Sequence, residues 1–104
     1  MAKNKYTIRY LPSFSKELNE IIYYITFILK NKNAAARLLQ NIHNAIEQRG
    51  KSPESYEIYK GKKKAKYNWY RIYVGNFTIF YIVRDSIIEI THIIYSARNF
   101  EELI

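Results

Sequence analysis

The 104-residue sequence predicts one α+β domain, spanning residues 1–104, in the order strand, antiparallel helical hairpin, three-stranded antiparallel meander and short C-terminal helical turn. Two observations predict this class. Apolar side chains recur at helical spacing through the first half of the chain and at alternate positions through the second half. Only three Gly and two Pro residues are present, so we expect short connections and a single hydrophobic core.

The expected elements follow from these patterns in order along the chain. They are a strand at 6–10, helices at about 13–30 and 34–49, strands at about 67–74, 77–84 and 87–96, and a helical turn from Asn99. Pro12 ends the first strand, and Ser13 is the expected N-cap of the first helix. Gly50 follows the second helix where a C-cap glycine would stand. We expect residues 51–66 to be the least ordered part.

Each predicted helix carries one apolar stripe. The first comprises Phe14, Leu18, Ile21, Ile22, Ile25, Ile28 and Leu29, and the second comprises Ala35, Leu38, Leu39, Ile42, Ala45 and Ile46. Because each apolar stripe must be buried against another element, and the sheet is the only one available, we expect both helices to cover one face of the sheet. The other face is then open.

Two tight turns determine how the meander strands pair. Gly75-Asn76 supplies the positive φ angles of a two-residue hairpin turn, and Asp85-Ser86 is a second, weaker turn signal. The first turn gives the core-face pairs Val74–Phe77, Ile72–Ile79 and Tyr70–Tyr81. If the second turn also has two residues, Ile88, Ile90 and Ile94 join the core face. Glu89, Thr91, Ile93 and Tyr95 then join the open face.

The open face brings candidate functional residues together. Cross-strand neighbours lie about 5 Å apart, so Arg71, Tyr73, Thr78 and Tyr95 are expected in one ligand-sized patch, with Arg98 at its rim. Arg binds phosphate in a bidentate fork and Tyr stacks on bases, so this patch suits phosphate and base recognition. A solvated sheet face with an ordinary strand arginine is the alternative interpretation.

The charge balance favours polyanionic partners. Lys and Arg number 17 against 9 Asp and Glu, a net charge of +8, and eleven of the aromatic residues are tyrosines. A lysine cluster precedes the meander and would extend the basic patch as a nucleic-acid-binding segment: Lys60, Lys62, Lys63, Lys64 and Lys66. A solvated loop and a basic protein without a nucleic-acid role are the corresponding alternatives.

Several other classes of protein and site are not expected. The chain has no Cys, which excludes a disulfide scaffold and thiolate zinc sites and is consistent with the cytoplasm. No signal peptide is recognised, and the longest apolar run is far shorter than the roughly 20 residues of a membrane helix. His43 is an expected surface residue and His92 a buried or edge residue, so we expect no metal and no cofactor.

Three segments together resemble toxins of the RelE/ParE superfamily. These are the opening Tyr6-Thr7-Ile8-Arg9-Tyr10-Leu11-Pro12, the meander from Tyr70 to Tyr81, and the tail Ile93-Ile94-Tyr95-Ser96-Ala97-Arg98-Asn99. The resemblance runs over nearly the whole chain, and the ordered set is more specific than any one segment. It implies a partner antitoxin that is acidic in its binding segment and covers the active surface of the toxin.

The resemblance implies one of two activities. RelE-like members cleave mRNA in the ribosomal A site, and ParE-like members poison DNA gyrase without being known as nucleases. Arg71 and Arg98 match basic positions of the RelE type, whereas Thr78 and Tyr73 stand where ribonuclease members carry Arg and Lys. Tyr95 occupies a place often held by His in ParE-like members, and the long first helix and the Gly-Asn-Phe turn are also ParE-like.

The resemblance thus implies a type II toxin, and the excess of positive charge and the Arg/Tyr face favour mRNA cleavage on the ribosome by an endoribonuclease. In that mechanism Arg71 and Arg98 neutralise phosphate charge, Tyr95 stacks or assists proton transfer, and Tyr73 and the lysines bind the nucleic acid. Gyrase poisoning and a catalytically silent basic binding domain are the alternatives.

Overall fold

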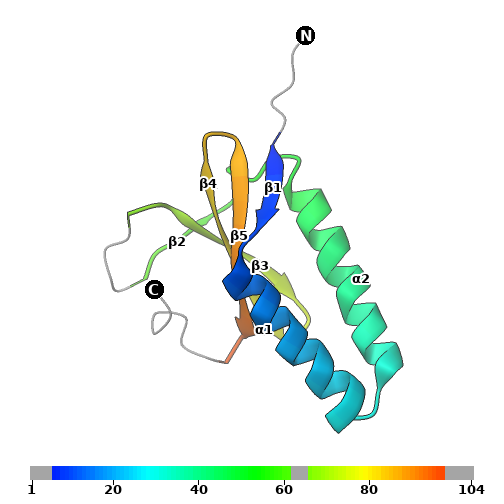
Figure 1. The fold of residues 1–104 in the computed structure, drawn as a ribbon. Helices are drawn as coiled ribbons and strands as arrows, with labels where there is room; N and C mark the ends of the chain where they lie inside the picture. The colour runs from blue at the N-terminus through cyan, green and yellow to red at the C-terminus, as the bar shows by residue number, and fades with distance from the viewer. Residues whose placement is uncertain (1–5, 62–65, 98–104) are drawn as a thin grey trace.

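The computed structural model describes residues 6–61 and 66–97, which form one sheet with helices on one side (Figure 1). The elements are β1 (Thr7–Tyr10), α1 (Pro12–Tyr23), η1 (Tyr24–Ile28), α2 (Lys32–Arg49), β2 (Ile58–Tyr59), β3 (Trp69–Val74), β4 (Phe77–Arg84) and β5 (Ile87–Tyr95). The predicted α+β class and the predicted order of strand, hairpin and meander are confirmed. The expected C-terminal helical turn lies outside the described residues.

The strands follow the order β1-β5-β4-β3-β2 in one sheet. Neighbours pair antiparallel from β2 to β5, whereas β1 pairs parallel with β5 and places Arg9 beside Glu89. Gly75 takes a φ of +58°, and Asp85 and Ser86 take φ values of 51° and 67°. Both predicted two-residue turns are therefore present, and the predicted pairing of β3 with β4 is confirmed.

The short strand β2 was not predicted. Its two residues lie within the segment expected to be least ordered, where Ile58 pairs with Tyr70 and Tyr59 pairs with Trp69. Two residues are too few to show an alternating pattern in the sequence. The pairing brings Tyr59 onto the same face as Trp69.

The start of each helix differs from the predicted one. Leu11 is the N-cap of α1, and Ser13 lies inside the helix, where its hydroxyl donates to the carbonyl of Thr91 on β5 at 2.5 Å. Asn31 is the N-cap of α2, because its side-chain oxygen accepts from the amide of Ala34 at 3.0 Å. Gly50 is the C-cap of α2, as predicted, although its φ of −62° is not the left-handed conformation common for glycine there.

The first helix ends in a π-helical segment, η1, rather than in regular α-helix. The amide of Leu29 bonds to the carbonyl of Tyr24, five residues back, at 2.9 Å. This wider turn shifts the later residues around the helix axis. As a result Ile28 and Leu29 are 57% and 56% exposed, and the prediction that they continue the core stripe is wrong.

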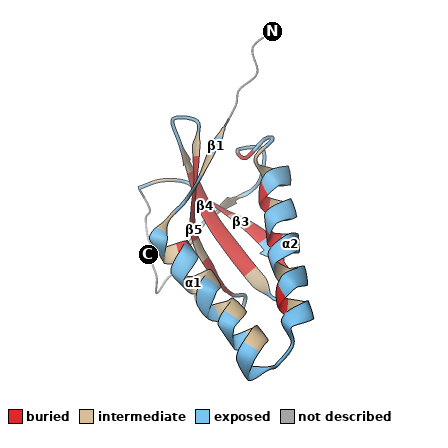
Figure 2. Cartoon of the chain, turned by 45° about the vertical axis from the view of Figure 1, so that its right-hand side comes forward, coloured by how far each residue is buried: buried red, intermediate tan, exposed pale blue. Residues whose placement is uncertain are grey.

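The core lies between the sheet and the two helices, as the buried strand residues in Figure 2 show. Its buried members are Phe14, Ile42, Ile46, Tyr70, Ile72, Val74, Ile79, Tyr81, Ile88, Ile90 and Ile93. The predicted covering of one sheet face by both helices is thus confirmed. No helix among the described residues is long and apolar enough to cross a membrane.

A β-bulge changes the face on which the end of β5 lies. Tyr81 pairs with Ile90, but Phe80 pairs with His92, so Thr91 is the extra residue, and its hydroxyl donates to the Phe80 carbonyl at 2.9 Å. After the bulge, Ile93 joins the helix-side core and Ile94 packs with Phe80 on the other face. The predicted faces of Ile93, Ile94 and Tyr95 are therefore wrong.

Among the described residues, the far half of β5 is an edge, because β1 pairs with residues 87–90 alone. Glu17 of α1 covers this edge: one carboxylate oxygen accepts from the amide of Ile93 at 3.0 Å, and the other lies 2.9 Å from His92 Nδ1. His92 is half-buried, so the prediction of a buried or edge histidine is confirmed. Glu17 satisfies backbone that would otherwise be open to another strand.

Candidate functional site

The open face of the sheet carries a cation between aromatic rings. On β3 the alternation places Trp69, Arg71 and Tyr73 on this face. The Arg71 guanidinium carbon lies 4.6 Å from the centre of the Tyr59 ring and 5.6 Å from that of Tyr73. Tyr73 is 63% exposed and Arg71 is half-buried, so the phenol and the guanidinium both reach the surface.

Thr78 lies on this face, as predicted, but it is not part of an accessible patch. It is only 4% exposed, and its hydroxyl lies 2.8 Å from the hydroxyl of Ser96. Beside it, Phe80 and Ile94 form a small second core with Tyr59 and Trp69. The centre of the open face is therefore apolar, and its cations stand around that centre.

The lysine cluster is only partly within the described residues. Lys66 is exposed, and its ammonium lies 5.5 Å from the centre of the Tyr67 ring. Lys62, Lys63 and Lys64 lie outside the described residues, as does Arg98. Of the predicted cations that the structure describes, Arg71 lies on this face, whereas Lys60 and Lys66 are exposed outside the strands.

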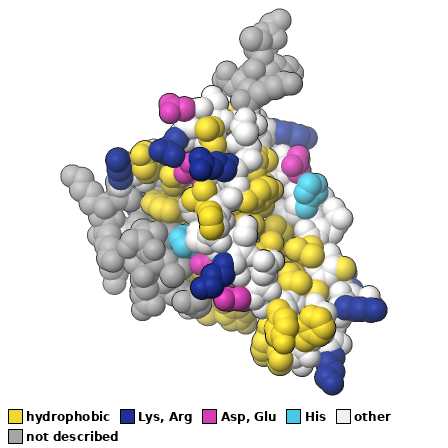
Figure 3. All heavy atoms as spheres, in the orientation of Figure 1, with side chains coloured by type: hydrophobic (Ala, Val, Ile, Leu, Met, Phe, Trp, Pro, Cys, Tyr) yellow, Lys and Arg dark blue, Asp and Glu magenta, His cyan; other side chains and the backbone are white. Residues whose placement is uncertain are grey.

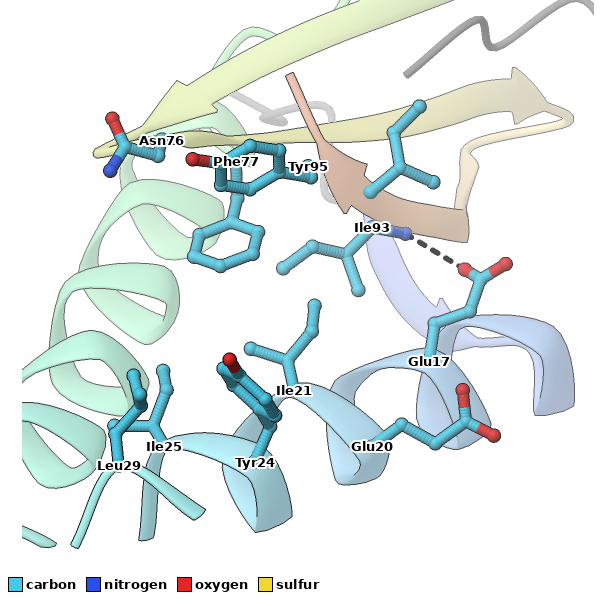
Figure 4. A pocket seen from close by; sticks show the side chains of 11 residues that line it. Glu17, Glu20, Ile21, Tyr24, Ile25, Leu29, Asn76, Phe77, Ile93 and Tyr95 are labelled. Carbon is cyan, nitrogen blue, oxygen red and sulfur yellow. Dashed lines mark hydrogen bonds between the residues drawn. The ribbon is translucent and has the colours of Figure 1, made fainter. Parts of the chain in front are cut away.

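Tyr95 is not on the face that carries Arg71. It pairs with Phe77 across β4 and β5, and the two rings meet edge to face with centroids 5.7 Å apart. Both residues line a cavity of about 610 Å³ between the first helix and the sheet, drawn in Figure 4. The prediction that Tyr95 shares a patch with Arg71 and Tyr73 is therefore wrong, and the cause is the bulge at Thr91.

The helical hairpin ends in an exposed hydrophobic surface, which we call the apolar tip. Its members are each more than half exposed: Tyr23, Tyr24, Phe27, Ile28 and Leu29. Figure 3 shows hydrophobic side chains gathered over this end of the molecule. The tip borders the cavity, since Tyr24 and Leu29 belong to both. The sequence indicates this surface by a run without charged residues from Ile21 to Leu29. The helical periodicity of the run, taken alone, assigns it to the core instead.

A partly buried network of hydrogen bonds joins α2 to β3, the strand that carries Arg71. The Arg49 guanidinium donates to the Tyr81 hydroxyl at 2.9 Å and to the Arg71 carbonyl at 3.0 Å. Tyr81 in turn donates to the Pro53 carbonyl at 2.6 Å. Burial raises the pKa of Tyr81 to about 12, although the hydrogen bond and charge of Arg49 oppose that shift. Sequence reasoning missed Arg49, because a single arginine near a helix end carries no signal of a tertiary partner.

The described residues contain no group of three or more His, Cys, Asp or Glu side chains that could hold a metal ion. The open face presents the Arg71 guanidinium beside the aromatic rings of Tyr59 and Tyr73. Such a surface binds anions and stacks planar groups.

Two solved structures share this fold. The first, described as "Chromosomal ParDE TA system from P. aeruginosa", has a TM-score of 0.70 and 12% identity, with 89% of this chain and 98% of that chain covered. The second is an archaeal RelE-RelB complex from Pyrococcus horikoshii OT3, with a TM-score of 0.51, 17% identity and coverage of 91% and 99%. Comparison with curated protein sequences found no match.

The sequence itself matches a family over residues 8–100, that is, from β1 into the segment beyond β5. The family is described as the ParE toxin of type II toxin-antitoxin system, parDE. The match covers most of the chain, and the resemblance to the RelE/ParE superfamily expected from the sequence is confirmed. The chain therefore belongs to the ParE toxin family of type II toxin–antitoxin systems.

Proposed function

We propose that this toxin arrests growth by poisoning DNA gyrase and that an antitoxin neutralises it. The observation that carries the choice of gyrase over mRNA is the separation of Tyr95 from Arg71 onto opposite faces of the sheet. A ribonuclease site needs its proton-transfer group within hydrogen-bond reach of the same phosphate that its arginine stabilises. Thr78, which stands where ribonuclease members carry Arg, is buried and bonded to Ser96.

Purified toxin should be tested in parallel on both targets. With gyrase and relaxed plasmid we expect inhibited supercoiling and linear DNA after protein denaturation, the product of a trapped cleavage complex. With translating ribosomes we expect intact mRNA. The gyrase proposal would be contradicted if supercoiling is unaffected and mRNA is cut at discrete positions only while ribosomes translate it. The function would then be mRNA cleavage.

Ribosome-dependent mRNA cleavage is the second candidate function, and the placement of Arg71 between Tyr59 and Tyr73 favours it. In this mechanism Arg71 and Arg98 would stabilise the phosphate charge, and Tyr73 would stack on a base. Lys62, Lys63, Lys64 and Lys66 would hold the backbone. The double variant Arg71→Ala, Arg98→Ala should then lose transcript cutting while folding normally.

The antitoxin partner follows from the family and from two properties of this chain. Its net charge of +8 opposes association with a second copy and favours an acidic partner. The apolar tip presents aromatic and aliphatic side chains beside a cavity that Ile21, Ile25 and Phe77 help to line. An amphipathic helix with an apolar stripe and acidic flanks fits such a surface, so we infer that the antitoxin inserts one there.

A further inference from the structure

The end of the open face farthest from Tyr73 holds two arginines around one carboxylate. Arg9 comes from β1, Arg84 from the end of β4, and Glu89 from β5 between them (Figure 1). One Glu89 oxygen lies 2.7 Å from an Arg84 nitrogen and 3.5 Å from an Arg9 nitrogen. We call these three residues the arginine pair and its counter-ion.

The group carries more positive charge than the carboxylate requires. A buried carboxylate needs one well-placed cation, and Glu89, whose side chain is 7% exposed, has two. The arginine side chains are themselves 61% and 43% exposed, so both can be reached from solvent. One positive charge remains in excess of the carboxylate.

Arg84 is held in place from a second side. Its guanidinium carbon lies 5.5 Å from the centre of the Tyr67 ring. Hydrogen bonds to Glu89, and secondarily to Tyr67, raise the pKa of Arg84 above its ordinary value. A guanidinium that is fixed by a carboxylate and a phenol loses little conformational entropy when it binds an anion.

The arginine pair and Arg71 lie on the same face of the sheet, with Arg71 on β3, Arg84 on the neighbouring strand β4, and Arg9 on β1 at the far edge. Arg71 is opposite Phe80 on β4, and Arg84 is four residues further along that strand, which corresponds to about 13 Å. Trp69 lies on β3 between these positions and, with Tyr59, packs around the small second core. Cations separated by aromatic rings on one face suit a polyanion whose repeating units also stack.

We propose that Arg9 and Arg84 form a phosphate-binding site for the backbone of a single-stranded nucleic acid that lies along the open face towards Arg71. Glu89 positions the two guanidiniums and limits their charge. The aromatic rings on this face favour nucleic acid over an acidic polypeptide, because bases stack and carboxylate side chains do not. This inference concerns direct contact with nucleic acid and holds for either proposed target of the toxin.

The test is the affinity of the full-length chain for labelled single-stranded DNA and RNA of equal length, measured by fluorescence anisotropy over a range of salt concentrations. Arg9→Ala and Arg84→Ala should each weaken binding about tenfold near 0.1 M salt and lower the slope of log K against log salt by about 1. The matched control is Arg37→Ala, which removes the same charge from the exposed surface of α2 and should leave the slope nearly unchanged. The ratio of the two affinities identifies DNA or RNA as the preferred strand.

Glu89→Gln is the second variant, because Arg84→Ala leaves a buried carboxylate with one cation fewer and can lower stability. In the folded Glu89→Gln protein, the loss of the counter-charge should tighten binding and steepen the slope. The proposal is overturned if Arg9→Ala and Arg84→Ala behave like Arg37→Ala, or if folded Glu89→Gln binds no more tightly. Binding of polyglutamate through the arginine pair, with no binding of either oligonucleotide, would assign the site to an acidic protein instead.

Discussion

The two faces of the sheet are built from the same strands but present different chemistry. The helix side is apolar, and it continues beyond the core into an exposed surface at the apolar tip. The open side carries arginines and aromatic rings around a small apolar centre, and its buried carboxylate is paired with two arginines. The strand β5 contributes to both and changes face at Thr91. Such a division gives a small domain two surfaces of different character, one apolar and one cationic.

The largest expected effect tests the bulge that creates this division. Ile93→Asp should bury a carboxylate in the helix-side core, where Ile93 is 1% exposed, and cost several kcal/mol of a total stability of about 5–15 kcal/mol. Thermal unfolding followed by circular dichroism should show loss of the native transition. Ile28→Asp, at the exposed tip, is the control and should change stability by less than about 0.5 kcal/mol. A native melting temperature for Ile93→Asp would contradict the register of β5.

Unfolding at alkaline pH tests the hydrogen bonds that Tyr81 makes with Arg49 and Pro53. Tyr81 has a pKa raised from 10.0 to about 12, so the folded state keeps a proton that the unfolded state loses above pH 10. Its contribution, up to roughly 3 kcal/mol, is fully present below pH 10 and is lost as the pH rises towards 12. Urea unfolding between pH 9 and about 12 should show this fall. The Tyr81→Phe variant should be less stable than the wild type at neutral pH, and its free energy of unfolding should decrease less between pH 9 and about 12. An equal decrease in both proteins would exclude Tyr81 as the cause of the pH dependence.

A smaller effect is expected at the apolar tip, where a substitution should weaken antitoxin binding without lowering the stability of the toxin. Phe27→Asp places a charge on a side chain that is 61% exposed, so the stability of the toxin alone should hardly change. Antitoxin affinity, measured by isothermal titration calorimetry with the cognate antitoxin, should fall by about 2 kcal/mol, the size of an aromatic hot spot. Asn41→Asp, on the exposed surface of α2, adds the same single negative charge and is the matched control. Unchanged affinity for Phe27→Asp would remove the tip from the antitoxin interface.

The smallest stability effect is expected on the open face. Arg71→Ala removes a partly exposed guanidinium, while the backbone carbonyl that Arg49 binds stays in place, so stability should change by less than about 0.5 kcal/mol. The affinity for single-stranded nucleic acid should nevertheless fall by the amount expected when one phosphate contact is lost. Chemical denaturation and anisotropy on the same preparation measure both quantities. A large loss of stability would mean that Arg71 supports the fold rather than a ligand.

Much of the architecture was predictable because the signals are local. Alternation in β3 and β4 and the Gly75-Asn76 turn determine pairing within a few residues, and the pairs at Ile72 and Tyr70 were correct. The error in β5 came from counting alternation through Thr91, because a bulge adds one residue without changing the pattern of apolar side chains. That single residue moved Tyr95 out of the predicted site.

The fold class, the register of the first hairpin of the meander, the net charge and the resemblance to the family can all be predicted from the sequence, because each depends on spacing or composition within a segment. The residues that meet across the sheet become known only from the packed structure. Arg9 and Glu89 are 80 positions apart and become neighbours only when β1 pairs parallel with β5. Arg49 and Tyr81 meet only when α2 packs on the core. Contacts of this kind depend on strand order and helix packing, which no local periodicity encodes.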